Sequence, residues 1–328
     1  MIPRIIFGSI AMAAAMMPLC SVRSQTQPKL IAIANFGEHP VLRETVDGFK
    51  AAVIAGGFAD GKDVVFDYQH VNFDRSLIPQ LLAQTQAKKP ALILAMTTGV
   101  AQASIRGISD QSIPIVFAAV VDPVVAKIVP SFERGSETHT GASMMPDFDA
   151  SLEFLAKLLP GTKRIGTLFN PAEDNDKTNI ELLTAAAKKR GLELVTVGVD
   201  AQPDIPTRIQ SLRGRVDAIF LIQSNIIQTA MPVVAQVTGQ LKIPTINSIY
   251  NHDLRHQLAG FHAISYRKNG ERAGEIAVRI LKGEKPKDIA VYVPKAGDFS
   301  PFVSPKGLQL QGREVPTGLQ DCKCFVAD

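Results

Sequence analysis

Residues 56–63 come closest to a known catalytic motif, the loop that cradles nucleotide phosphates. Gly56, Gly61 and Lys62 stand at the required spacing, but Asp63 replaces the Ser or Thr whose hydroxyl would hold magnesium. The stretch also follows a helical pattern and enters an apolar strand pattern, whereas phosphate binding needs a loop that opens a helix. We therefore predict a turn that ends a helix.

Two pairs containing histidine could bind metal or move protons by their types alone. His252 and His256 stand four residues apart, and Glu38 adjoins His39. Two imidazoles without a third ligand are typical of a protein surface. Adjacent residues rarely present both side chains to one proton, so Glu38 and His39 are more suited to contacting a ligand or shaping a loop.

The sequence lacks the usual catalytic signatures. It contains no Gly-x-Ser-x-Gly elbow, no dinucleotide Gly-x-Gly-x-x-Gly and no His-Glu-x-x-His. The absence of these three motifs argues against a hydrolase, a dehydrogenase and a metalloprotease. We expect no enzyme activity, no cofactor and no metal site.

Polar residues recur instead at the ends of short apolar runs. A strand pattern, a loop carrying Thr, Asp, Asn or Tyr, and an amphipathic helix pattern follow one another at least eight times. In open α/β sheets the loops at the carboxyl ends of the strands form the ligand crevice. The pattern favours a binding protein.

The elements that position these loops fall into two similar halves. Strands are predicted at 30–35, 63–68, 91–96 and 113–120, and then at 164–169, 194–199, 218–222, 245–247 and 260–266. Helices are predicted between them, among others at 42–55, 151–159, 176–189, 226–240 and 270–281. The fold class is thus α/β, with two Rossmann-like lobes that have parallel sheets and a multi-strand hinge. A cleft should lie where the strand ends of the lobes face each other.

The first 24 residues resemble an export signal. Arg4 precedes an uncharged apolar run, and small residues surround Ser24, after which we predict cleavage. The run is too short for a membrane anchor. Acylation of Cys20 is the alternative, although Pro18 and Leu19 fit a lipoprotein signal badly.

Charge and cysteine content narrow the possible partners. The 328 residues include 35 Lys and Arg, of which two lie in the leader. The remaining 33 basic residues nearly balance the 31 Asp and Glu. Such a near-neutral chain disfavours nucleic acid as a partner. Cys322 and Cys324 would close a very tight loop, and we expect a frayed tail without catalytic consequence.

Several short segments recur in a characteristic order between about residue 32 and residue 293. They are His39-Pro40, residues 57–62, 97–101 and 113–117, Asp122-Pro123, Thr140-Gly141, and residues 159–161, 170–173 and 281–286. In this order the segments resemble the solute-binding components of bacterial ABC importers, in the family with a type I periplasmic-binding fold that includes receptors for tryptophan and other aromatic amino acids. One departure is Gln223-Ser224-Asn225, where many relatives carry Thr-Asp-Asn, and it removes an acid that could hold an ammonium group.

The resemblance implies that Thr97 and Thr98 contact ligand from one lobe, and Asn170, Glu173 and Asn175 from the other. Helix amides after Thr97 could receive a carboxylate, and Asp122 or Glu173 an ammonium. Aromatic faces of Phe36, Tyr250 and Tyr266 could enclose a planar ligand. The full candidate set is Phe36, Glu38, His39, Thr97, Thr98, Asp122, Asn170, Glu173, Asn175, Ser224, Asn225, Tyr250 and Tyr266. The alternative is that these residues cap helices, fix turns or pack in the core.

We therefore expect a monomeric periplasmic receptor that closes two lobes over an amino acid or an aromatic or organic acid and offers the closed form to an ABC permease in the inner membrane. A receptor for a membrane signalling partner is the alternative, and an exported enzyme a weaker one. The expected division is 1–24 signal peptide, 25–142 with about 250–283 in lobe 1, 143–249 with about 284–312 in lobe 2, and 313–328 a C-terminal tail.

Overall fold

The apolar runs of the first half form a five-stranded parallel sheet. The computed structural model describes residues 27–327, and this sheet has the order β2-β1-β3-β4-β5. Its strands are β1 (Lys29–Asn35), β2 (Val64–His70), β3 (Leu92–Met96), β4 (Ile115–Val120) and β5 (His139–Ser143). Helices α1 (Pro40–Ala55) and α9 (Tyr266–Leu281) cover one face, and α2 (Ile78–Ala87) and α3 (Thr98–Gly107) cover the other. Strand β3 is buried along its whole length because helices cover both faces.

The second half forms a six-stranded sheet in the order β11-β10-β9-β8-β6-β7, parallel except for the pair β10 and β11. Its strands are β6 (Arg164–Phe169), β7 (Glu193–Gly198), β8 (Ala218–Leu221), β9 (Thr245–Asn247), β10 (Gly260–Ile264) and β11 (Phe299–Val303). Helices α4 (Phe148–Leu158), α5 (Asp174–Lys189) and α10 (Pro305–Leu310) lie on one side, and α6 (Ile205–Gln210), α7 (Asn225–Thr229) and α8 (Met231–Leu241) on the other. Each lobe therefore has its own apolar cores, and the predicted fold class is confirmed.

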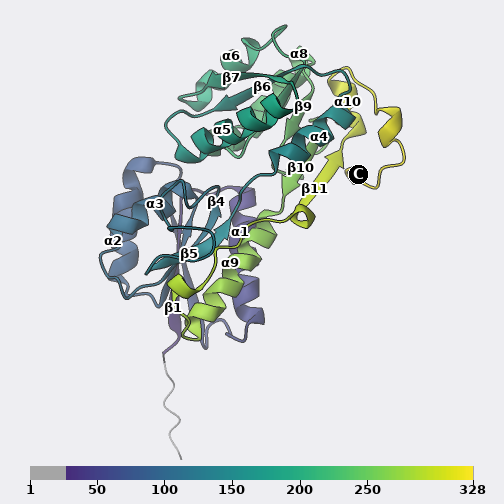
Figure 1. The fold of residues 1–328 in the computed structure, drawn as a ribbon. Helices are drawn as coiled ribbons and strands as arrows, with labels where there is room; N and C mark the ends of the chain where they lie inside the picture. The colour runs from purple at the N-terminus through teal and green to yellow at the C-terminus, as the bar shows by residue number, and fades with distance from the viewer. Residues whose placement is uncertain (1–26, 328) are drawn as a thin grey trace, which may run out of the picture.

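The chain passes between the lobes three times (Figure 1). Residues 144–147 join β5 to α4, Ser265 joins β10 to α9, and residues 293–298 join the end of lobe 1 to β11. These three segments form the expected multi-strand hinge.

The expected division of the chain needs two corrections. Residues 250–264 were assigned to lobe 1, but β10 pairs with β9 in the second sheet. Residues 284–292 were assigned to lobe 2, but Tyr292 pairs with Ala142 in lobe 1. Both errors arise because a local apolar pattern reveals a strand but not the strand with which it pairs.

The C-terminal tail is ordered where we expected fraying. Cys322 and Cys324 form a disulfide, and Val303 N donates to Cys324 O (2.7 Å) while Val326 N donates to Val303 O (2.9 Å). Val326 is 8% exposed and belongs to the core of lobe 2. The tail satisfies edge groups of β11 that would otherwise lack partners.

Helices α1 and α9 approach each other closely at glycines. A Cβ placed on Gly270 would lie 1.9 Å from Thr45 O, and one on Gly274 would lie 2.6 Å from Phe49 O. Because both helices begin at the side of lobe 1 that faces lobe 2, this contact fixes the positions of His39 and Tyr266, which stand at their first turns.

Candidate functional site

Three adjoining hollows lie between the lobes at the carboxyl ends of the strands. Each has a volume of about 20 Å³. Asn225 borders all three, and Thr97, Thr98 and Asn175 border two of them. Residues of both lobes line each hollow, so we refer to the three together as the cleft cavity.

The first lobe contributes a strained, unsatisfied helix start. Thr97 has φ +71° and ψ 156°, a conformation that a β-branched residue adopts only when its surroundings enforce it. The hydroxyls of Thr97 and Thr98 are buried without a hydrogen-bond partner, and no side chain caps α3. The first backbone amides of α3 and the hydroxyls of Thr97 and Thr98 therefore need a hydrogen-bond acceptor that the chain itself does not supply.

The second lobe contributes a half-buried carboxylate, Glu173, and a buried one, Asp176. Glu173 precedes α5, and Asn225 Nδ2 donates to its Oε2 at 2.5 Å. Asp176, which is 0% exposed, accepts from Asn170 N (2.7 Å) and Asn175 Nδ2 (2.8 Å). Burial raises the pKa of Glu173, and burial together with the Glu173 carboxylate raises the pKa of Asp176. A cation between the lobes would relieve this repulsion.

Strand β8 is followed by a third polar group. Gln223 is 6% exposed and its Oε1 has no partner, although its backbone carbonyl accepts from Asn175 Nδ2 at 3.2 Å. Ser224 precedes α7 without capping it. The unsatisfied groups of both lobes thus face one cavity.

Apolar side chains line the remainder of the cleft cavity. Burial raises the pKa of Tyr266, which borders two hollows. Phe36 and Ile78 line the hollow that contains Glu173. The apolar side chains of the other two hollows are Val41, Leu42, Phe73, Ala119, Val121, Met144 and Ile249. The cavity therefore has a polar end at Thr97, Thr98 and Glu173 and an apolar end beside α1 and α9.

Two hydrogen bonds join the lobes across the cleft. His39 Nε2 lies 3.1 Å from Gln228 O, and Arg75 Nη1 donates to Ala172 O at 2.6 Å. Arg75 opens the short helix η1 (Arg75–Leu77), whose cap is Asp74. These contacts hold the lobes together at the edge of the cavity.

Four predicted site residues lie outside the cleft cavity lining. Glu38 is exposed, pairs with Arg43 and accepts from Tyr68 (2.7 Å), so the pKa of Glu38 is lowered chiefly by that hydrogen bond. Asp122 accepts from Val124 N and Val125 N, both at 2.9 Å, which is the turn-fixing alternative.

The other two are Asn170 and Tyr250. Asn170 Oδ1 accepts from Ala172 N (2.9 Å), and its Nδ2 donates to Glu173 Oε1 (3.4 Å). Asn170 therefore helps to position the Glu173 carboxylate. Tyr250 packs on Phe302 with ring centroids 4.5 Å apart, within the apolar core of lobe 2. Tyr250 therefore does not line the cleft cavity in this structure.

The cavity also contains residues that the sequence did not indicate as site residues. Arg75, Gln102 and Asp174 border the hollow that also contains Thr98 and Glu173. Gln102 stands one helical turn after Thr98, and this spacing could have revealed it. Asp176 lies inside the first turn of α5, where it accepts a hydrogen bond from Asn170 N.

The other chemical candidates do not form reactive sites in the described part of the chain. Residues 56–63 end α1 and enter β2, as predicted. No group of three or more His, Cys, Asp or Glu residues within 27–327 could hold a metal. Within the same range no helix is both long and apolar enough to cross a bilayer.

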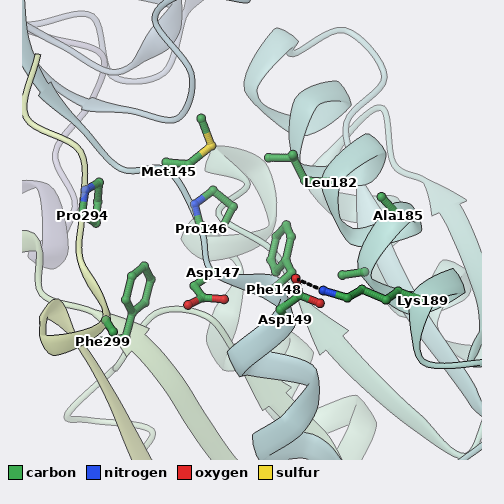
Figure 2. A pocket seen from close by; sticks show the side chains of 12 residues that line it. Met145, Pro146, Asp147, Phe148, Asp149, Leu182, Ala185, Lys189, Pro294 and Phe299 are labelled. Atoms are coloured by element: carbon green, nitrogen blue, oxygen red, sulfur yellow. Dashed lines mark hydrogen bonds and ion pairs between the residues drawn. The ribbon is translucent and has the colours of Figure 1, made fainter. Parts of the chain in front are cut away.

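A larger hollow of about 440 Å³ lies beside the hinge (Figure 2). Met145 and Pro146 of the first crossing, Pro294 of the third, and Lys189, paired with Asp149, surround it. No predicted site residue borders this hollow, which is lined mainly by apolar side chains.

Residues 30–319 match the family described as ABC transporter substrate binding protein. The chain belongs to this family. A curated relative, the tyrosine-binding protein of Clostridioides difficile (strain R20291), is 34% identical over 263 residues, which cover 80% of this chain and 75% of the relative. The family and the tyrosine-binding relative are substrate-binding proteins, so the chain is a solute-binding protein and not an enzyme.

Solved structures in the family give the same fold. A structure from Streptococcus pneumonia in complex with L-Trp is 26% identical, with a TM-score of 0.84 over 91% of this chain and 100% of that chain. A ligand-free, open structure of a substrate-binding protein from Clostridium difficile is 31% identical, with a TM-score of 0.69 over 91% of this chain and 99% of that chain. The chain therefore superposes more closely on the L-Trp complex than on the ligand-free, open structure. Sugar-binding proteins of 14–16% identity share the type I periplasmic-binding fold alone.

Proposed function

We propose that the chain is the extracytoplasmic solute-binding component of an ABC importer, and that its ligand is an amino acid or a related aromatic or organic acid. The observation that carries the proposal is the polar end of the cleft cavity. There, hydroxyls of Thr97 and Thr98 without partners face the Glu173 carboxylate of the other lobe. Relatives that bind tyrosine and tryptophan support the same ligand class.

The cavity suggests how such a ligand would lie. Its carboxylate would accept from Thr97, Thr98 and the first amides of α3, where the helix dipole favours an anion. Its ammonium would meet Glu173, which compensates for the absence of an acid at Gln223-Ser224-Asn225. Its side chain would fill the apolar end beside Leu42, Met144 and Tyr266.

Ligand binding drives closure in this proposal because the ligand touches both lobes. A ligand that contacted one lobe alone would not distinguish the open from the closed arrangement. The closed form is then the one that a membrane permease recognises.

Thr98→Val should weaken binding about tenfold, because the variant loses a hydrogen bond to a charged group while keeping its shape. The measurement is isothermal titration at pH 7.5 with L-tyrosine, L-tryptophan and L-leucine, and with 3-(4-hydroxyphenyl)propanoate, which lacks the amino group. Thr167→Val is the matched control, because the Thr167 hydroxyl is also buried without a partner but lies on β6 away from the cleft cavity. Absence of binding by every compound, or equal affinity in wild type and Thr98→Val, would contradict the proposal.

Arg75→Gln should speed dissociation of the same ligand about threefold, because one exposed cross-lobe hydrogen bond is lost. Stopped-flow dissociation into excess competitor measures the rate. Arg106→Gln, at another exposed arginine of lobe 1, is the control for the change in net charge. An unchanged rate in Arg75→Gln would mean that the contact with Ala172 does not hold the lobes together.

Export to the periplasm is part of the proposal and concerns residues 1–24, which lie outside the described residues. N-terminal sequencing of protein from the extracytoplasmic fraction should find Gln25 first. An acylated Cys20 at the N-terminus would instead favour a lipoprotein.

A further inference from the structure

His39 performs two tasks at the mouth of the cleft cavity. It is the N-cap of α1, where its Nδ1 accepts from Val41 N at 3.4 Å, and its Nε2 lies 3.1 Å from Gln228 O in the other lobe. The two contacts fix the ring's protonation. Because Nδ1 must keep its lone pair to accept, the proton of a neutral ring is on Nε2 and is donated to Gln228.

The acceptor side of this contact is rigid. Gln228 Nε2 donates to Ile222 O (2.9 Å) and to Asn247 Oδ1 (2.8 Å), while Asn247 Nδ2 donates back to Gln228 Oε1 (3.1 Å). This reciprocal amide pair ties α7 to β9, and Gln228 is 6% exposed. The carbonyl that receives the His39 proton is therefore held in place.

We propose that His39 is a proton-sensitive latch: the neutral ring joins the lobes across the cleft, and protonation releases the latch and the bound solute. The inference rests on the proposed function, since it assumes that a solute is held by closure. It assigns His39 a role in retaining the ligand by joining the lobes, beyond lining the cleft cavity.

Protonation opposes the latch for a geometric reason. A charged ring has hydrogens on both nitrogens, so Nδ1–H would face Val41 N–H, and a positive charge would stand at the N-terminus of α1. To escape, the ring must turn away from the cap, and a turned ring no longer reaches Gln228 O. Burial lowers the pKa of His39 in the closed arrangement, so the neutral form is present at neutral pH.

The Gln228 carbonyl favours the charged ring, but burial outweighs it, so the net effect is a lowered pKa of His39. The other groups around His39 do not reverse this direction. The surrounding hollow contains one other titratable side chain among the described residues, Tyr266, whose pKa is raised. Glu38, the neighbour in sequence, is paired with Arg43 and Tyr68. On α7 there is no charged residue, and Glu173 borders the adjoining hollow instead.

Two substitutions separate the two tasks. His39→Asn keeps a good helix cap but is too short to reach Gln228, and His39→Gln keeps an amide donor near the Nε2 position but caps poorly. Neither side chain titrates. The control is His70→Gln, because His70 also accepts a backbone hydrogen, from Asn72 N (3.1 Å), but stands exposed at the end of β2.

The experiment measures the Kd of L-tyrosine, which stays zwitterionic throughout, at pH 7.5 and pH 5.0. Wild type and His70→Gln should bind about three- to tenfold more weakly at pH 5.0 through faster dissociation. His39→Asn should bind that much more weakly already at pH 7.5. In both His39 variants the ratio of the Kd at pH 5.0 to the Kd at pH 7.5 should be smaller than in wild type. The remaining pH dependence comes from Glu173 and Asp176, which all the proteins share.

Parallel pH profiles in wild type and both His39 variants would overturn the latch, and so would undiminished affinity of His39→Asn at pH 7.5. If L-tyrosine does not bind, the compound that binds in the titration above replaces it. If none of them binds, the ligand class proposed above is wrong, while the latch is still tested by small-angle scattering of the ligand-free protein. The radius of gyration should increase between pH 7.5 and 5.0 in wild type and stay constant in His39→Asn. An equal response of the two proteins would again overturn it.

Discussion

Glu173→Gln should lower the affinity for an amino acid about 10- to 100-fold, because a charge-assisted hydrogen bond to the ligand ammonium is replaced by a neutral one. The same variant should bind the analogue without an amino group as well as wild type does. Titration of both compounds measures the two affinities. Glu181→Gln, an exposed position on the same helix, is the control. Equal losses for the two compounds would show that Glu173 does not face the ammonium.

Stability provides an independent check on Glu173→Gln. An acid whose folded pKa is raised binds its proton more tightly in the folded state, so the folded state loses stability as pH rises from the unfolded pKa of about 4.5 through the raised value. At neutral pH the wild-type carboxylate therefore destabilises the free protein, and the glutamine variant should unfold at equal or higher urea concentration. A less stable variant would make its weaker binding uninformative.

Gly270→Ala should destabilise lobe 1 by about 2–3 kcal/mol or more, because the added methyl group meets the Thr45 carbonyl and the backbones of α1 and α9 must separate. Binding should weaken as well, since the two helices carry His39 and Tyr266 into the cleft cavity. Urea unfolding and titration with L-tyrosine measure the two effects.

Gly239→Ala is the matched control for the glycine prediction. Gly239 lies inside α8 with open space around the added Cβ, so alanine should stabilise the helix by about 0.5–1 kcal/mol. If Gly270→Ala unfolds within about 0.5 kcal/mol of wild type, the close contact between the helices is not required.

The sequence predicted the strand ends correctly because continuous apolar runs and polar loops are local properties. Thr97, Thr98, Glu173, Asn175 and Asn225 were predicted as neighbours from different strands, and the structure brings them to one cavity. Their contact with a ligand stays a prediction. These residues could be predicted because they follow apolar runs that were identified as strands.

Side-chain direction was not visible in the sequence. Tyr250 follows a strand end as the other candidates do, yet it turns into the apolar core of lobe 2 against Phe261 and Phe302. The Asp122 carboxylate accepts a hydrogen bond from Val124 N in the turn that follows it. Arg75 was missed because it reaches Ala172 from the opposite lobe, a contact that no local pattern encodes. The pairing of β10 was missed for the same reason.

The three crossings affect the order in which the protein can assemble. Helix α9, which completes the apolar layer over α1, is separated from it by the greater part of lobe 2 in the chain. A ribosome therefore releases the beginning of the first lobe long before the helix that covers it, and a fragment ending near residue 150 would expose the bare side of α1 to solvent. Neither lobe is formed by one continuous segment of the chain. Lobe 1 can therefore complete its folding only after α9 has been synthesised, close to the end of translation.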